Sequence, residues 1–234
     1  MTHICKNAAV AGRARGSWTI ALALGLIFFA GAARGQDESK LKIKQLTAVW
    51  NGADLQGWKT FFDDPTVDAQ SIWSVADGAL KLDAGKHKGY LYTETAYANY
   101  HLHAEWRWPK DAAPKANSGI LLHLQGENKI WPACYQFQLK ANDAGQLLGM
   151  ELDIPAAPLV NYQKRADKLE KPSEKPFGEW NTCEIYCRAD SIEVFVNNVR
   201  QNKVERLQSG KGAIGLQLEG HPIEFKNIWL EPGI

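Results

Sequence analysis

Short runs of alternating hydrophobic and polar residues fill most of the chain beyond residue 46, and Gly, Asn, Asp and Pro separate them. This two-residue period is typical of β-strands, because successive side chains of a strand point to opposite faces of its sheet. No sustained 3.6-residue period is present, although residues 159–170 suit a short helix. The predicted strands are Leu80–Leu82, Gly89–Thr93, His101–Trp108, Gly119–Leu124, Tyr135–Lys140, Thr182–Ala189, Ser191–Val196, Gly212–Leu218 and Pro222–Leu230.

So many short strands predict an all-β fold, a jelly-roll sandwich of two antiparallel sheets. Each sheet has one apolar face that must be covered, and a second sheet is the usual cover. Residues 46–234 contain no internal repeat and no low-complexity tract, so we expect them to form a single domain. Residues 36–45 are polar and charged, which is typical of a loose lead-in to a domain.

The phase of the alternation predicts which side chains share a face. In Gly119–Leu124, for example, it points Leu124 into the core and His123 away from it. If the strands are neighbours, their polar side chains form one continuous surface. The polar side chains that the phase turns away from the core are His101, His103, Glu105, Arg107, His123, Gln136, Gln138, Lys140, Gln217 and Glu219.

The chemistry of these side chains suits sugars. Amides and carboxylates make paired hydrogen bonds to neighbouring hydroxyls, and indole rings stack on the apolar side of a pyranose. The chain has nine Trp residues, and Trp131, in the loop sequence KIWPAC, is the best candidate for stacking on a sugar. The alternative interpretation is that the polar face is only the solvated side of an antiparallel sheet.

Ordinary retaining hydrolysis of a glycosidic bond is disfavoured by this set of residues. That reaction uses two carboxylates beside the scissile oxygen. Glu105 and Glu219 are the acids among the face residues, and the pattern ExDxxE on one strand is absent, since the comparable positions hold Gln136, Gln138 and Lys140. No compact Asp/His cluster predicts a metal site, which leaves a divalent ion as an open alternative.

The first 35 residues have the features of a secretory signal peptide. Lys6, Arg13 and Arg15 precede an apolar run over residues 18–30, and small residues follow it. The run is shorter than the roughly 20 residues that span a bilayer, which disfavours a membrane anchor. We therefore expect an exported protein, periplasmic or extracellular, whose mature chain is not inserted in a membrane.

Charge and cysteine content narrow the function further. The chain has 27 basic and 26 acidic residues, and the first 35 residues hold four of the basic ones and no acid. Because a polyanion-binding surface needs clustered Lys and Arg, nucleic acid is disfavoured as a partner. Beyond the leader, Cys134, Cys183 and Cys187 form no CxxC pair, and we interpret them as buried free thiols.

Several stretches, in order from about residue 50 to 230, resemble the 3-keto-disaccharide hydrolase domain family, whose fold is a concanavalin A-like jelly roll. Each stretch is weak alone, but six in the same order are specific. They are WNGADLQGW (50–58), YHLHAEWRW (100–108), NSGILLH (117–123), GEWN (178–181), AIGLQLEG (213–220) and IEFKNIWL (223–230).

The resemblance implies action on glycosides already oxidised at C3. A C3 ketone acidifies the C2 proton, so a base can remove it, the C1 substituent is expelled, and water adds to the product. Such a site needs one base, donors for the enolate oxygen, and an acid or cation for the leaving group. The candidate bases are Glu105, His123 and Glu219. The candidate oxyanion donors are Arg107, Asn117 and Gln138. The residues expected to bind the carbohydrate are Asn117, Gln136, Gln138, Gln217 and Trp131.

One position departs from the family pattern. The family usually has Glu where this chain has Gln136, two residues before Gln138. Loss of that carboxylate favours an alternative function, a non-catalytic carbohydrate-binding module of the cell envelope. A structural or interaction module of the envelope is a third alternative.

Overall fold

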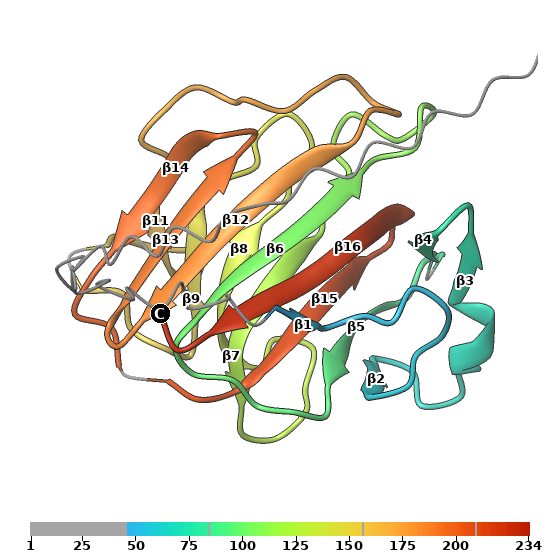
Figure 1. Cartoon of the computed structure of the whole chain (residues 1–234), viewed down its shortest axis with the longest axis horizontal. Helices are drawn as coiled ribbons and strands as arrows, with labels where there is room; N and C mark the ends of the chain where they lie inside the picture. Colours follow the sequence, from blue (N-terminus) through green and yellow to red (C-terminus); the bar gives the residue numbers. More distant parts are fainter. Residues whose placement is uncertain (1–45, 84, 156, 209) are drawn as a thin grey trace, which may run out of the picture. The chain divides into compact units, whose positions relative to one another are not determined.

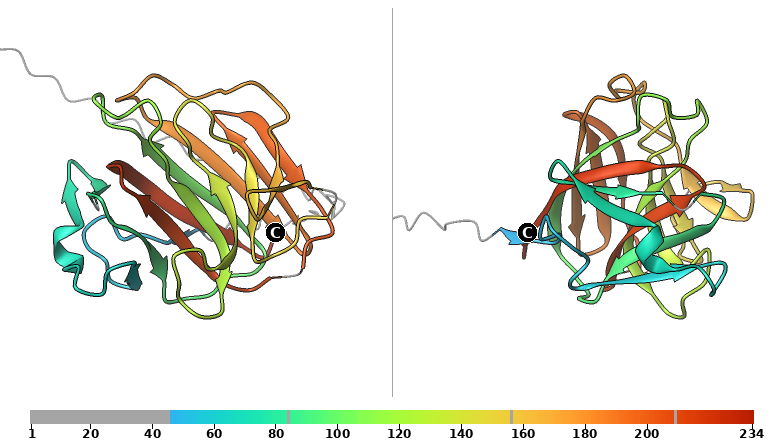
Figure 2. Two further views of the ribbon diagram at one scale, coloured as in Figure 1. Left: turned by 180° about the vertical axis from the view of Figure 1, so that it is seen from behind. Right: turned by 90° about the vertical axis from the view of Figure 1, so that its right-hand side faces the viewer.

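The structure is a computed structural model that describes residues 46–83, 85–155, 157–208 and 210–234. These residues form two eight-stranded sheets packed face to face, and every strand pair within a sheet is antiparallel (Figures 1 and 2). One 3-10 turn, Ala69–Ser71, precedes β3. The predicted all-β, two-sheet jelly roll is therefore confirmed.

The first sheet, sheet A, has the strand order β14-β13-β12-β6-β16-β4-β3, and β1 pairs with β16 outside this path. Its long central strand β6 lies between β12 and β16. Its strands are β1 (Thr47–Ala48), β3 (Trp73–Ala76), β4 (Ala79–Leu82), β6 (Tyr100–Arg107), β12 (Asn181–Arg188), β13 (Ser191–Val196), β14 (Val199–Val204) and β16 (Ile223–Pro232).

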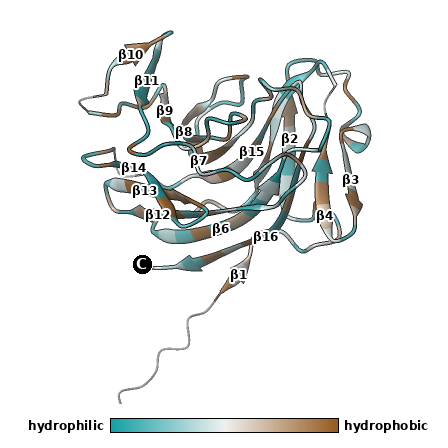
Figure 3. Cartoon of the chain, turned by 90° about the horizontal axis from the view of Figure 1, so that it is seen from above, coloured by the Kyte–Doolittle hydropathy of each residue, from teal (hydrophilic) through white to brown (hydrophobic). Residues whose placement is uncertain are grey.

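The second sheet, sheet B, has the strand order β10-β11-β9-β8-β7-β15-β5-β2. At one end of it the β10–β11 hairpin extends away from the two layers (Figure 3). The strands of sheet B are β2 (Trp58–Phe62), β5 (Lys88–Thr93), β7 (Gly119–Gln125), β8 (Ala133–Gln138), β9 (Leu147–Met150), β10 (Leu159–Val160), β11 (Gln163–Ala166) and β15 (Ala213–Glu219).

The core fills the space between the sheets. Strand β6 shows how the alternation builds it, because Leu102, Ala104 and Trp106 are fully buried while the residues between them are only half-buried. Trp106 packs edge-on to Trp108, with ring centroids 6.2 Å apart. A second, smaller apolar cluster lies on the outer face of sheet B, where Leu121 and Met150 are buried.

Residues 159–170 do not form the short helix that their sequence suits. Val160 pairs with Gln163 instead, which makes β10 and β11 a tight hairpin. Strand β11 then continues sheet B through its pairing with β9, in which Arg165 lies opposite Leu148. The backbone therefore gains ladder hydrogen bonds from a neighbouring strand, which the local sequence pattern does not reveal.

Cys134, Cys183 and Cys187 are free and buried, as predicted. Burial raises the pKa of each of these thiols, which keeps them protonated and unreactive. Among the described residues, no helix is long and apolar enough to cross a membrane. The predicted signal peptide (residues 1–35) and polar lead-in (residues 36–45) lie outside the described residues, so both stay predictions.

Candidate functional site

Polar side chains gather on the outer face of sheet B, across three neighbouring strands. Gln136 and Gln138 come from β8, and Gln217 and Glu219 come from β15. Strand β7 lies between them and places Gly119 opposite Gln138. The alternation put these four polar side chains on one face, and the strand order makes them neighbours.

A small network of amides forms the floor of the site. Gln136 Nε2 donates to Gln138 Oε1 at 2.5 Å and to Gln217 Oε1 at 2.8 Å. Gln136 is 1% exposed, and its side chain lies over Gly119, where a Cβ atom would stand 2.5 Å from Gln136 Nε2. Both hydrogens of the Gln136 amide nitrogen are therefore used inside the network, and the amide nitrogen of Gln138 stays available to a ligand.

Glu219 is the acid of this face. Asn117 Nδ2 donates to its Oε2 at 2.5 Å. Burial raises the pKa of Glu219, and the Asn117 hydrogen bond and the charge of Lys88, opposite it on β5, offset part of this rise. A carboxylate with a raised pKa is suited to accept a proton near neutral pH.

A hollow of about 310 Å³ opens over these side chains. It brings together five of the predicted site residues, namely Asn117, Trp131, Gln136, Gln138 and Glu219. Trp131 lies at the rim and is 38% exposed, and its ring centroid is 6.0 Å from Lys88 Nζ. A sixth predicted residue, Gln217, does not line the hollow but accepts a hydrogen bond from Gln136, which does. The lining residues are Asn117, Trp131, Gln136, Gln138, Leu148, Met150, Asn161, Gln163, Arg165 and Glu219.

Arg165 is a site residue that the sequence analysis missed. It lies on β11 opposite Leu148, which places it in the same row as Gln136, and it also borders a separate depression. Its Nε is buried and has no hydrogen-bond partner among the described residues. A buried, unpaired guanidinium donor is costly, and a ligand oxyanion in the hollow would satisfy it.

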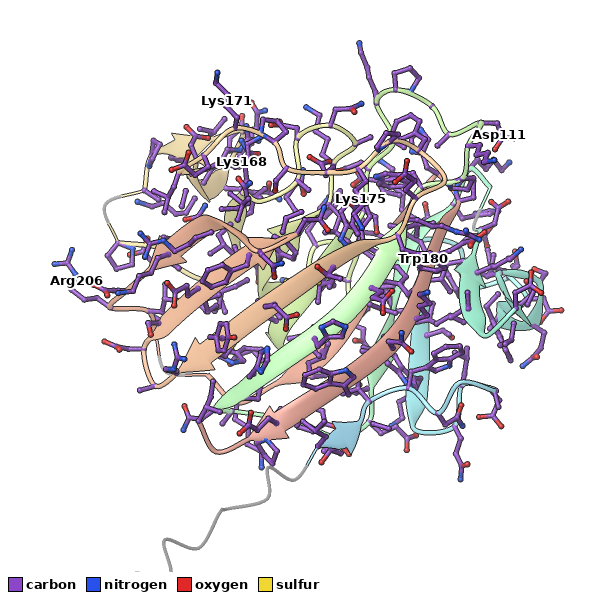
Figure 4. The ribbon with its side chains drawn as sticks, turned by 45° about the horizontal axis from the view of Figure 1, so that its top comes forward. Asp111, Lys168, Lys171, Lys175, Trp180 and Arg206 are labelled. Atoms are coloured by element: carbon purple, nitrogen blue, oxygen red, sulfur yellow. The ribbon has the colours of Figure 1, made fainter. Side chains whose placement is uncertain are left out.

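Glu105 and Arg107 lie elsewhere, because β6 belongs to sheet A and not to sheet B. The expectation that all the polar faces form one surface is therefore wrong for β6. Glu105 accepts from Asn227 Nδ2 at 2.6 Å, and Arg107 binds Glu224 through two nitrogens. Both belong to the outer face of sheet A, where Trp180 marks one end (Figure 4).

The same face holds a satisfied cluster of rings and charges. Glu184 accepts from His101 at 2.6 Å and from His103 at 2.7 Å. Tyr186 stacks on His101, and Trp229 stacks on His103. These groups are engaged with each other through hydrogen bonds and stacking, and these contacts stabilise the sheet.

His123 points into the sandwich and not toward Gln136. A bulge in β7 between Leu122 and Gln125 places His123 at φ 52° and reverses the alternation from that residue onward. Its ring packs edge-on against the buried Tyr100 and Tyr135, and burial lowers its pKa. The predicted outward orientation of His123 and inward orientation of Leu124 are therefore both wrong.

The hollow is poorly suited to a divalent cation. Glu219 is the single carboxylate among its lining residues, and the other oxygen ligands there are neutral amides. Among the described residues, no three His, Cys, Asp or Glu side chains converge on a metal position.

The sequence matches the model of the 3-keto-alpha-glucoside-1,2-lyase-like domain over residues 45–231. The chain belongs to this family. Membership confirms the resemblance seen in the sequence, and it covers both sheets and the hollow. Among curated proteins, no sequence matches the chain.

Solved structures share the fold at low sequence identity. A "putative glycosyl hydrolase" from Parabacteroides distasonis is 18% identical, with a TM-score of 0.59, over 82% of this chain and 95% of that one. The carbohydrate-binding module CBM66 from Bacillus subtilis is 10% identical, with a TM-score of 0.55, over 76% and 98%. A Bacillus licheniformis β-glucanase is 10% identical, with a TM-score of 0.55, over 80% and 97%. The likeness shows a fold used for both carbohydrate hydrolysis and carbohydrate binding.

Proposed function

We propose that this protein cleaves 3-keto-glycosides by elimination and hydration in the hollow on sheet B. The observation that carries the proposal is the position of Glu219, a half-buried carboxylate of raised pKa in a hollow that also holds amide donors and Arg165. One base beside several donors is suited to proton abstraction next to a ketone and to stabilisation of the enolate. Family membership supports the same substrate class.

In the proposed reaction Glu219 removes the C2 proton of the sugar. The electron pair moves toward the C3 oxygen, and the enolate is stabilised by Arg165 and by the free amide hydrogens of Gln138. The enolate then re-forms the C3 ketone and a C1–C2 double bond, and the aglycone leaves with the C1–O electron pair. Glu219 exchanges the abstracted proton with solvent before the next step. Water then adds its hydroxyl to C1 and gives its other proton to the aglycone oxygen, and Glu219 delivers the exchanged proton to C2.

Release of the aglycone tests the proposal. The purified protein is incubated with a 3-keto-glycoside and with its unoxidised parent, each with and without a chelator. We expect release from the keto sugar alone, and no effect of the chelator, because the hollow has a single carboxylate to offer a cation. Release from neither substrate by folded protein would contradict the proposal.

A non-catalytic carbohydrate-binding module is the second candidate function, and Gln136 is the observation that favours it. The amide occupies the centre of the floor, at the position where the family usually has Glu. The variant Gln136→Glu separates the two functions. A large gain in turnover would identify a degenerate catalytic site, whereas saturable binding of unoxidised glycans without turnover in either protein would identify a binding module.

We also propose that the protein is exported. The charged and apolar pattern of residues 1–35 supports this, and the burial of the three described thiols is compatible with an oxidising compartment. Mass spectrometry of the protein from fractionated cells tests it, with a mature amino terminus near residue 36 outside the cytoplasm as the expected result.

A further inference from the structure

Tyr162 stands at the tip of the β10–β11 hairpin and is 98% exposed. Val160 pairs with Gln163, so Asn161 and Tyr162 form a two-residue turn, with φ 49° and 65°. Such turns favour Asn followed by Gly, because both central residues adopt the left-handed conformation. A bulky aromatic residue is strained there and gains no burial, so folding does not account for it.

Tyr162 borders a second hollow of about 330 Å³ that is continuous with the first. The two hollows share Trp131, Met150, Asn161 and Gln163. Tyr162 and Glu151 complete the second one, and Glu151 is already paired with Lys129 at 2.5 Å. The polar site around Glu219 therefore opens directly into a space bordered by two aromatic rings and a thioether.

We infer that Trp131 and Tyr162 form the aglycone subsite of the enzyme, and that its substrates are 3-keto-glycosides with an aromatic aglycone. This inference rests on the proposed function. A planar ring can stack on indole and phenol faces, and Met150 adds an apolar side chain to the lining. The indole of Trp131 borders both hollows, so it lies at the junction where a glycosidic oxygen would pass from the polar hollow to the aromatic one.

The leaving-group chemistry of the aglycone also favours substrates with an aromatic aglycone. An alcohol aglycone needs an acid to protonate it, and the one carboxylate that lines the second hollow is held by Lys129. A phenol, with a pKa of about 10, leaves as the phenolate without such help. The bond that breaks is C1–O, and its electron pair stays on the phenolate oxygen, which takes a proton from the water that adds to C1.

Binding to two glucosides that differ only in the aglycone tests the subsite. Isothermal titration calorimetry compares the binding of phenyl α-D-glucoside with that of methyl α-D-glucoside. This measurement does not require catalysis. We expect the wild-type protein to bind the phenyl glucoside about tenfold more tightly. In Tyr162→Gly, which relieves the backbone strain, this preference should disappear, whereas Tyr162→Phe should keep it. Leu159→Ala, on the same hairpin and outside both hollows, is the matched control.

Turnover of the 3-keto forms of the two glucosides separates this inference from the proposed function. Loss of the phenyl preference in Tyr162→Gly, together with no turnover of either keto sugar by the wild-type protein, would support the subsite and contradict the catalytic proposal. Turnover of both keto sugars by wild-type protein that binds the two glucosides equally would overturn the subsite alone. Tighter binding of maltose than of phenyl glucoside would also overturn it, in favour of a second sugar.

Discussion

The side chain of Gln136 lies directly over Gly119 on the neighbouring strand, so that a Cβ atom at position 119 would stand 2.5 Å from Gln136 Nε2 and 2.7 Å from its Cγ. This close approach holds the amide where it reaches both Gln138 and Gln217. Gly119, in the motif NSGIL, therefore leaves space for the side chain of Gln136 on the next strand and does not form a turn.

The variant Gly119→Ala should fold but lose the site. The added methyl group displaces Gln136, which breaks the amide network at a cost of about 1 kcal/mol in the free energy of unfolding. We expect a small decrease in the denaturant midpoint and a large loss of ligand affinity. Urea unfolding and calorimetric titration measure the two effects. Unchanged affinity would show that the position of Gln136 does not matter for binding.

The variants Glu219→Gln and Glu105→Gln should differ sharply in turnover of a 3-keto-glycoside. Removal of a general base typically costs 10²–10⁴ in rate, roughly, so we expect a loss of about that size for Glu219→Gln. Glu105 lies on the other sheet and binds Asn227, so its variant should keep the wild-type rate. Steady-state kinetics test both. Equal losses of turnover in the two variants would show that Glu105 also takes part in the reaction.

The pH dependence of kcat/KM should have an acidic limb above the ordinary range of a glutamate. Burial raises the pKa of Glu219, and the base acts only when ionised, so activity rises with pH through that raised pKa. The hydrogen bond from Asn117 lowers the pKa, and its removal in Asn117→Ala should shift the limb to higher pH. A limb that stays in place while the rate falls would assign Asn117 a purely structural role.

Glu184 should contribute acid-sensitive stability on the outer face of sheet A. Burial alone raises its pKa, but hydrogen bonds and charge from His101 and His103 lower it to about 2, below the ordinary 4.5. Because the pKa is depressed in the folded state, the stabilisation is complete above pH 4.5 and is lost as pH falls toward 2.

The comparison of Glu184→Gln with the wild type isolates this contribution. The variant should be less stable by about 1–2 kcal/mol at neutral pH. Chemical unfolding between neutral and acidic pH measures the difference, which should shrink as the pH falls below 4.5. A difference that does not change with pH would mean that the carboxylate charge is unimportant.

The alternation in the sequence was enough to predict most of the fold and the amide floor of the site. Strands with a clear two-residue period, such as Ser191–Val196, have the predicted bounds, and the face of Gln136 and Gln217 is as predicted. Short strands such as β9 (Leu147–Met150) were missed because four consecutive apolar residues show no alternation.

The failures have physical causes that a single sequence does not display. The phase placed Glu105 correctly outward, but only the strand order shows that its sheet is the opposite one. A bulge turned His123 inward, and bulges leave little trace in a hydrophobic pattern. Arg165 was missed because β11 depends on pairing with β9 for its strand structure, and its own sequence suits a helix equally well.

The central claim is that Glu219 removes the C2 proton of a 3-keto-glycoside. The most direct measurement is turnover in deuterium oxide. The released sugar is analysed by mass spectrometry and NMR before its C2 hydrogen exchanges spontaneously with the solvent. The account predicts one solvent deuterium at C2 of each released sugar, and neither release nor C2 exchange with Glu219→Gln. Release of a sugar that keeps its original C2 hydrogen would contradict the account, because it would show direct cleavage at C1.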